Sequence, residues 1–185
     1  MRRTSLALLA TLLAGPATAQ AVLDRDAAAA QLFDARGVVV SIQRHAFLSE
    51  ADVATLGALP RVATLKYYGA MAAHPSDGLQ SARTRGAFNF HSVKTARAAA
   101  LAGCGAGCVV VADILPRGYA PDRALTLNQD ATAAVSGRAG RRAGPDAALA
   151  VSRTTGAWGL GAGGAAALAT CAAEGAGDCA LAFGR

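Results

Sequence analysis

The chain has 185 residues, of which 53% are hydrophobic, and its formal net charge at pH 7 is +6. This length suits one compact domain, and beyond the N-terminal region no stretch is long and apolar enough for a membrane-spanning helix. Because the charge is mild and no Lys/Arg run is interleaved with aromatic residues, we expect no nucleic-acid partner.

Residues 1–19 predict a secretory signal peptide. Arg2 and Arg3 form a charged start, residues 6–13 form a short apolar run, and Ala17-Thr18-Ala19 is a typical cleavage site. We therefore expect a periplasmic or secreted protein without a membrane span after signal removal, and an uncleaved membrane anchor is the alternative. Without the two arginines, 16 basic residues stand against 12 acidic ones, so the mature charge is +4.

Residues 20–61 are predicted to form a helical lead-in that packs on the rest of the chain and is not a separate domain. Residues 24–36 contain four consecutive alanines, which favour a helix, and Asp24 or Asp26 can cap its N-terminus. The glycine that follows suits the end of that helix.

The second part of the lead-in contains one strand signal and one helix signal. Residues 38–42 are apolar but too few for more than an edge strand. Ser49 and Asp52 have the spacing of a capping box, with aspartate in place of the usual glutamate. Pro60 is expected to end the short helix that follows.

Residues 62–115 predict the order strand, strand, helix, strand. The strands are expected at residues 62–73, 79–90 and 108–115. The sequence His74-Pro75-Ser76-Asp77-Gly78 predicts a turn between the first two strands. Ser92 is expected to cap a helix over residues 93–103.

Residues 146–185 repeat this order, so we predict a duplicated unit. In both segments Ala-Leu-Ala and one small residue precede a cysteine, a Gly-rich turn follows, and a second cysteine starts an apolar run. Gly156 corresponds to Gly78, and residues 82–90 are an insertion of the first unit. The predicted fold is α+β, with two ββαβ-like repeats that form small antiparallel or mixed sheets and pack their helices on them.

Residues 116–145 are predicted to link the two units through a helix. Asn128 is a favourable N-cap for this helix, which we expect over residues 128–137. A Gly-rich segment with three arginines follows, and we expect a solvated loop there, with an acidic partner as the alternative role. These arginines are Arg138, Arg141 and Arg142.

Four cysteines in an exported chain most economically form two disulfides. Three pairings are possible, and we favour Cys104–Cys108 and Cys171–Cys179, because each pair joins a helix end to the next strand within one unit. A long link such as Cys104–Cys171 would remove more conformational entropy from the unfolded chain and so would stabilise the fold more. The preference for the short links therefore depends on the proximity of the partners. Zinc binding is the alternative, but the spacings differ from those of zinc knuckles, and we expect no metal.

Two repeated motifs carry a family resemblance. The pattern A-x-A-x-S-x-x-x-G, with A-L-A-x-C, a Gly-rich turn and C-x-V-V, resembles the exported bacterial family called domain of unknown function 4189. The carriers are residues 148–156, 100–110 and 167–179, and the resemblance extends from about Tyr68 to the C-terminus. Residues 125–135 and the lead-in resemble an alphaproteobacterial subgroup. The resemblance implies export, a duplicated disulfide-bearing domain and no agreed activity, and it supplies no catalytic residues.

Chains of this subgroup are sometimes described as 5-aminolevulinate synthases, an activity that we judge physically implausible here. That reaction uses pyridoxal phosphate bound to a lysine in a much larger cytosolic fold. The only lysines here are Lys66 and Lys94. A G-x-G-x-x-G pattern at Gly159, Gly161 and Gly164 is an expected chance match among 21 glycines, so we expect no cofactor.

No catalytic constellation is predicted. His74, Ser76 and Asp77 combine nucleophile-type groups, but neighbours in one tight turn rarely point at one another, so we expect a structural turn. The second unit provides an internal control, because its turn at residues 152–155 has neither histidine nor acid.

The remaining ionisable residues predict structural roles. His45, His74 and His91 are well separated in the sequence, so they do not predict a metal site. Asp113 lies inside an apolar strand and, if it is buried, is expected to form an ion pair with Arg117.

We predict a non-enzymatic module that binds an unidentified protein or a component of the cell envelope. Basic and aromatic residues of the insertion, with one tryptophan, form the candidate contact surface: Arg83, Arg85, Phe88, Phe90 and Trp158. Core packing is the alternative role for the aromatic residues, including Tyr67 and Tyr68. A small hydrolase that uses His74 or His91 is the alternative function, and a purely structural envelope protein is the third.

Overall fold

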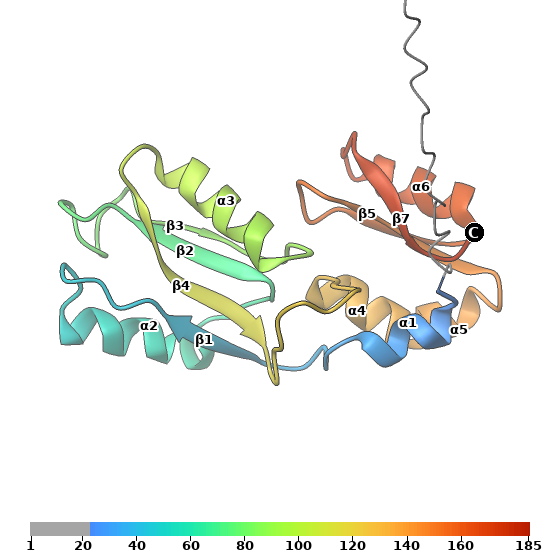
Figure 1. The fold of residues 1–185 in the computed structure, drawn as a ribbon, viewed down its shortest axis with the longest axis horizontal. Helices are drawn as coiled ribbons and strands as arrows, with labels where there is room; N and C mark the ends of the chain where they lie inside the picture. The colour runs from blue at the N-terminus through green and yellow to red at the C-terminus, as the bar shows by residue number, and fades with distance from the viewer. Residues whose placement is uncertain (1–22) are drawn as a thin grey trace, which may run out of the picture.

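The computed structural model describes residues 23–185 as an α+β fold with two small antiparallel sheets that carry helices on their faces (Figure 1). The predicted fold class is therefore confirmed. The predicted signal peptide at residues 1–19 lies outside the described residues. Within residues 23–185, no helix combines the length and hydropathy that crossing a membrane would require.

The first sheet has four strands and a helix on each face (Figure 1). The strand order is β1 (Val38–Ile42), β4 (Val109–Pro116), β2 (Gly69–Ala73) and β3 (Arg85–Ala87). Helix α2 (Glu50–Val62) packs Leu56 on one face. Helix α3 (Val93–Cys104) packs Ala96 and Ala100 on the alanines of β2 from the other face. Because β1 comes from the lead-in and pairs with β4, the lead-in is part of this sheet.

The second sheet has three strands between two helical layers (Figure 1). The strand order is β6 (Trp158–Ala162), β5 (Ala147–Ser152) and β7 (Cys179–Phe183). Helix α6 (Gly164–Ala173) packs Ala167 and Cys171 against β5. The opposite side carries α1 (Arg25–Gln31) and α4 (Gln129–Ser136), and α5 (Arg138–Arg142) follows directly.

The two units have the same strand order, with the first strand of each unit at the centre. In the first unit β2 lies between β4 and β3, and in the second unit β5 lies between β7 and β6. A register shift occurs between Met71 and Ala72 in β2 and between Leu149 and Ala150 in β5. These positions correspond in the sequence alignment of the two segments. The shared topology is what a duplication would produce, and the duplication itself stays a prediction.

Both predicted disulfides are confirmed. Cys104 is bonded to Cys108 and Cys171 is bonded to Cys179. Each bond links the last turn of a helix to the start of the next strand, with sequence separations of 4 and 8. The predicted N-caps are also present, because Ser92 accepts from the backbone N–H of Thr95 and Asn128 from that of Ala131.

Several predicted element boundaries are wrong. The helix predicted at residues 24–36 ends at Gln31, although Asp24 caps it as expected. The capping box of Ser49 and Asp52 is confirmed, but Pro60 lies inside α2. The proline has no N–H to donate to the helix, yet the helix continues to Val62, and Ala63 N still donates to Leu59 O.

The extended segments and the linker also differ from expectation. Within residues 62–73 only Gly69–Ala73 is a strand, and within residues 79–90 only Arg85–Ala87. The segment with three arginines, predicted to be a loop, is helix α5, although its arginine side chains are solvent-exposed as predicted. A short helix needs only one hydrogen-bonded turn, which the sequence pattern did not reveal.

Candidate functional site

The boundary between the two units is held by Asn128, whose side chain is fully buried. Its Nδ2 group donates to the carbonyl oxygen of Asn89 at 2.9 Å and to that of Gly156 at 2.8 Å. Its Oδ1 atom accepts from Ala131 N at 2.8 Å, as the cap of α4. One side chain therefore joins the first unit, the linker helix and the second unit.

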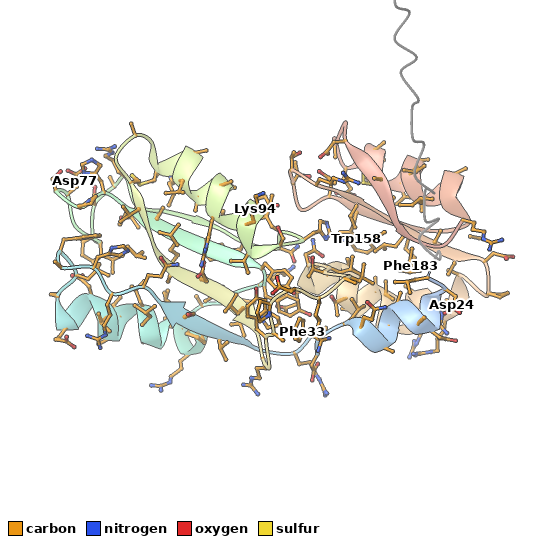
Figure 2. All side chains as sticks on the ribbon, viewed as in Figure 1. Asp24, Phe33, Asp77, Lys94, Trp158 and Phe183 are labelled. Atoms are coloured by element: carbon orange, nitrogen blue, oxygen red, sulfur yellow. A yellow bond between two sulfur atoms is a disulfide. The ribbon has the colours of Figure 1, made fainter. Side chains whose placement is uncertain are left out.

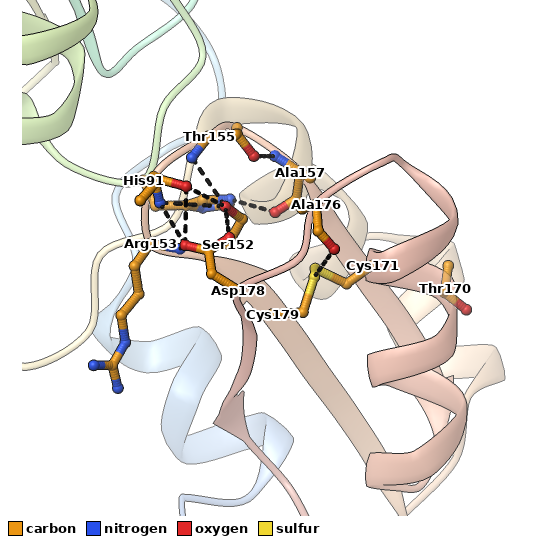
Figure 3. Close-up of a disulfide and its surroundings, with 12 residues drawn as sticks. His91, Ser152, Arg153, Thr155, Ala157, Thr170, Cys171, Ala176, Asp178 and Cys179 are labelled. Carbon is orange, nitrogen blue, oxygen red and sulfur yellow. Dashed lines mark hydrogen bonds between the residues drawn. A yellow bond between two sulfur atoms is a disulfide. The ribbon is translucent and has the colours of Figure 1, made fainter.

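His91 lies beside Asn128 and uses both of its ring nitrogens. The backbone N–H of Asn128 donates to Nδ1 at 3.1 Å, so the proton of the neutral ring is on Nε2, which lies 3.0 Å from the carbonyl oxygen of Ala157 (Figure 3). Burial lowers the pKa of His91 below its ordinary value. A hydrolase needs a histidine with a nitrogen that can take a proton from the nucleophile, and these contacts occupy both nitrogens.

The free energy of unfolding is expected to fall as the pH is lowered from about 7 to about 5, through the ordinary histidine pKa. The His91 pKa is lowered in the folded chain, so the unfolded chain takes up the proton at a higher pH, and protonation favours unfolding. Urea unfolding across this range should show this fall. The change of the free energy of unfolding with pH should be smaller in His91→Gln than in wild type and should be retained in His45→Gln. An equal change in wild type and both variants would exclude His91 as its source.

The side chains of His74, Ser76 and Asp77 contact one another, although neighbours in a tight turn were not expected to do so. The Ser76 hydroxyl oxygen is 2.8 Å from His74 Nδ1 and 2.9 Å from Asp77 Oδ1. The hydrogen bond from Ser76 is the main cause that lowers the pKa of Asp77, and Arg83 also pairs with Asp77 at 3.2 Å. His74 Nδ1 also lies 3.5 Å from Asp77 Oδ1, so serine and acid face the same ring nitrogen, whereas in a catalytic triad they lie at opposite nitrogens of the histidine. The arrangement therefore stabilises the turn and does not activate Ser76.

The corresponding turn of the second unit contacts an acid from a distant segment, Asp178, which the sequence analysis did not predict. Ser152, at the position of His74, donates to Asp178 Oδ1 at 2.5 Å, next to the Cys171–Cys179 disulfide (Figure 3). This hydrogen bond is the largest contribution to the lowered pKa of Asp178. In the first unit Gly107 takes the place of Asp178, and a Cβ there would lie 2.6 Å from His74 Nε2. In the first unit the large His74 therefore faces a glycine, and in the second unit the small Ser152 faces the larger Asp178.

The G-x-G-x-x-G pattern serves helix packing. A Cβ at Gly159 would lie 2.3 Å from the carbonyl oxygen of Ala167, and one at Gly161 would lie 2.7 Å from Ala166 Cβ. The two glycines of β6 therefore allow the backbone of α6 to lie directly on the sheet.

The five residues of the predicted contact surface do not gather in one place. Arg83 pairs with Asp77 at one end of the first sheet, whereas Trp158 packs against the core of the second unit (Figure 2). Phe88 is 37% exposed and lies against Gly69 of β2 and Gly86 of β3.

Two further residues of that surface are engaged within the chain. Phe90 packs against the alanines of α3, and Arg85 donates to the carbonyl oxygen of Ala82 at 2.6 Å. Tyr67 and Tyr68 are fully buried, which confirms core packing as their role. Contact of Arg83, Arg85 and Phe88 with a partner stays a prediction.

Asp113 forms its ion pair with Arg97 of α3 and not with Arg117. Arg97 donates from Nε to Oδ1 at 2.8 Å and from Nη2 to Oδ2 at 2.6 Å, and Gln43 donates to Oδ2 at 3.1 Å. The Asp113 side chain is 5% exposed, and its hydrogen bonds raise the pKa of Arg97. Arg117 lies beyond the end of β4 against Gly37, so it is not the partner.

A groove of about 730 Å³ lies above this ion pair, and we call it the α3–β4 groove. It exists because α3 covers β2 and β3 but leaves β1 and part of β4 uncovered on this face (Figure 1). Its floor and wall are mostly apolar, with one serine, one lysine and the Arg97–Asp113 pair. The lining residues are Ser41, Val93, Lys94, Arg97, Ala98, Leu101, Asp113, Leu115 and Tyr119.

A smaller cavity of about 200 Å³ adjoins the groove at the N-terminus of α3, and we call it the Tyr68 cavity. The groove and the cavity are neighbours, because both are lined by Val93, Lys94 and Tyr119. The other residues of the cavity are Tyr68, Ser92, Ala120, Asp122, Arg123 and Thr126. Sequence reasoning missed both spaces. The one available signal was the helical spacing of Val93, Arg97 and Leu101, which places them on one face of α3.

Comparison of the chain with protein-family models, with curated proteins and with solved structures finds no match. The interpretation of the groove and cavity therefore depends on their own geometry and chemistry.

Proposed function

We propose that the chain is an exported, non-enzymatic binding module of the periplasm or cell envelope, and that its ligand is an envelope component held in the α3–β4 groove. The groove is the observation that carries this proposal. Its volume of about 730 Å³ lies within the usual range for small-molecule sites, and mostly apolar walls with a few polar groups are typical of such sites. We place the ligand there because the residues of the predicted contact surface lie apart.

Export is supported by the two disulfides, which persist in oxidising compartments, and by the predicted signal peptide. The resemblance to domain of unknown function 4189 agrees with this location and belongs to the same proposal. The contacts of the histidines favour a binding module over a hydrolase. His91 has both nitrogens engaged, and His74 faces Ser76 and Asp77 with the same nitrogen, whereas a triad needs them at opposite nitrogens.

Native mass spectrometry of the mature protein, purified oxidised from the periplasm, tests this proposal. We expect a co-purifying small molecule on the wild-type protein and its loss from Ala98→Trp. Ala98 is exposed on α3 and lines the groove, so an indole there fills the groove without changing the core.

The matched control is Ala102→Trp. Ala102 is exposed on the same helix but lies outside the groove lining, so this variant should keep the ligand. Equal occupancy of both tryptophan variants would place the ligand elsewhere. A wild-type protein that carries no small molecule, and that binds none from a periplasmic extract, would contradict the binding function itself.

A further inference from the structure

The Tyr68 hydroxyl is a buried hydrogen-bond donor without a partner. Tyr68 is 1% exposed, and within residues 23–185 its hydroxyl has no hydrogen bond. Burial raises the pKa of this phenol, so the group stays protonated and remains a donor. Buried polar groups in folded proteins nearly always have a partner, because an unpaired one destabilises the fold. Tyr68 lines the small cavity, so an acceptor bound there is a candidate partner once the cavity wall shifts enough to expose the hydroxyl.

The surroundings of the cavity favour an acceptor with negative charge. Lys94 is exposed at the edge shared with the groove, and it forms no ion pair with any residue of the described range. Arg123 lines the cavity and lies over the Phe33 ring, with its guanidinium carbon 3.9 Å from the ring centroid. The partial positive charge of the α3 N-terminus adds to these two cations. Asp122 is the one acidic residue of the lining, so the cations outnumber it.

We propose that the Tyr68 cavity binds the carboxylate or phosphate head of a single-chain amphiphile, and that its apolar chain lies in the α3–β4 groove. This proposal rests on the proposed binding function. The shared walls at Val93, Lys94 and Tyr119 allow one molecule to occupy both spaces. Leu101 and Leu115 contact the chain, and the Arg97–Asp113 pair is neutral overall, so it does not repel an anion.

Calorimetric titration of the mature oxidised protein with four ligands, below their micelle concentrations, tests this assignment. Dodecanoate and dodecyl phosphate are expected to bind, and whichever binds more tightly identifies the head group. Dodecanol should bind at least about tenfold more weakly, because it lacks the charge that Tyr68 and Lys94 recognise. Inorganic phosphate should also bind weakly, because it does not fill the groove.

Three variants test the residues. Tyr68→Phe should weaken dodecanoate binding by about tenfold and Lys94→Gln by about fivefold, with the second effect reduced at high salt. Lys66→Gln is the matched control, because Lys66 is paired with Asp130 at 2.6 Å and lies outside the cavity lining, so its affinity should not change. Unliganded Tyr68→Phe should be at least as stable to urea as wild type, since the hydroxyl it loses has no partner.

The outcomes separate this proposal from the proposed function. The anion site would be wrong if dodecanol and dodecanoate bound equally, or if Tyr68→Phe and Lys94→Gln left the affinity unchanged. The proposed function would still stand in that case, provided that Ala98→Trp blocks ligand binding in the groove. If none of the four ligands binds but another molecule co-purifies, the amphiphile is wrong and the binding function stands. If nothing binds in either experiment, both are wrong.

Discussion

Replacing Asn128 by alanine is expected to lower the free energy of unfolding by roughly 3–7 kcal/mol. The substitution removes the cap of α4 and leaves the carbonyl oxygens of Asn89 and Gly156 without the donor that now satisfies them. An unsatisfied buried acceptor destabilises by about 1–3 kcal/mol, and a lost cap by about 1 kcal/mol. Urea unfolding followed by circular dichroism measures the change.

Two control variants separate the contributions of Asn128. Asn128→Ser can keep the cap but has no group that reaches both carbonyls, so it should recover only a small part of the loss. Ser49→Ala removes the solvent-exposed cap of α2 and should destabilise clearly less than Asn128→Ala. If Asn128→Ala destabilised no more than Ser49→Ala, Asn128 would act only as a cap and would not hold the two units together.

Removing both disulfides is expected to lower the free energy of unfolding by roughly 4–4.5 kcal/mol. In the chain-entropy model, the separations of 4 and 8 residues correspond to about 2 kcal/mol for Cys104–Cys108 and about 2.5 kcal/mol for Cys171–Cys179. Each pair should be replaced by alanine, because Cys104 and Cys171 are buried. Unfolding of the two single-bond variants and of the combined variant measures each contribution.

Reduction of the wild-type protein provides the control for these variants. A thiol reductant should destabilise it by a similar amount and should leave the combined alanine variant unaffected. Peptide mass spectrometry of the non-reduced protein should find only the links within each unit. A link between the two units, or a loss of stability on reduction that exceeds that of the combined variant, would contradict the independent short loops.

Local features of the fold could be predicted because their causes are local. The caps Ser49, Ser92 and Asn128 depend on a side chain and the backbone three residues ahead of it, so short sequence windows contain them. The disulfides could be predicted because each pair is separated by a short turn. Strand lengths were overestimated because the segments around Tyr68 and Phe90 are paired only locally. These two residues exchange two backbone hydrogen bonds, but the pairing does not continue as a regular strand along either segment.

The candidate site could not be predicted because its contacts join distant segments. Asp113 pairs with Arg97 and not with the nearer Arg117, because the pleat directs Asp113 to the face that α3 covers. Asp178 meets Ser152 across 26 residues. The groove and cavity result from how far α3 extends over the first sheet and from where Tyr119 passes its N-terminus. Neither is visible in a pattern of single residues.

The lead-in imposes an order on folding in a chain that is synthesised from its N-terminus. Strand β1 has no partner until residues 109–116 have followed, and the core that contains Ala28 of α1 is complete only with Leu149 and Phe183. The backbone N–H of Gly184 donates to the carbonyl oxygen of Leu23, so the two ends of the described range are hydrogen-bonded to each other. The N-terminal part of the described chain therefore depends on its C-terminal part, and the native structure is completed only after the last strand has been synthesised.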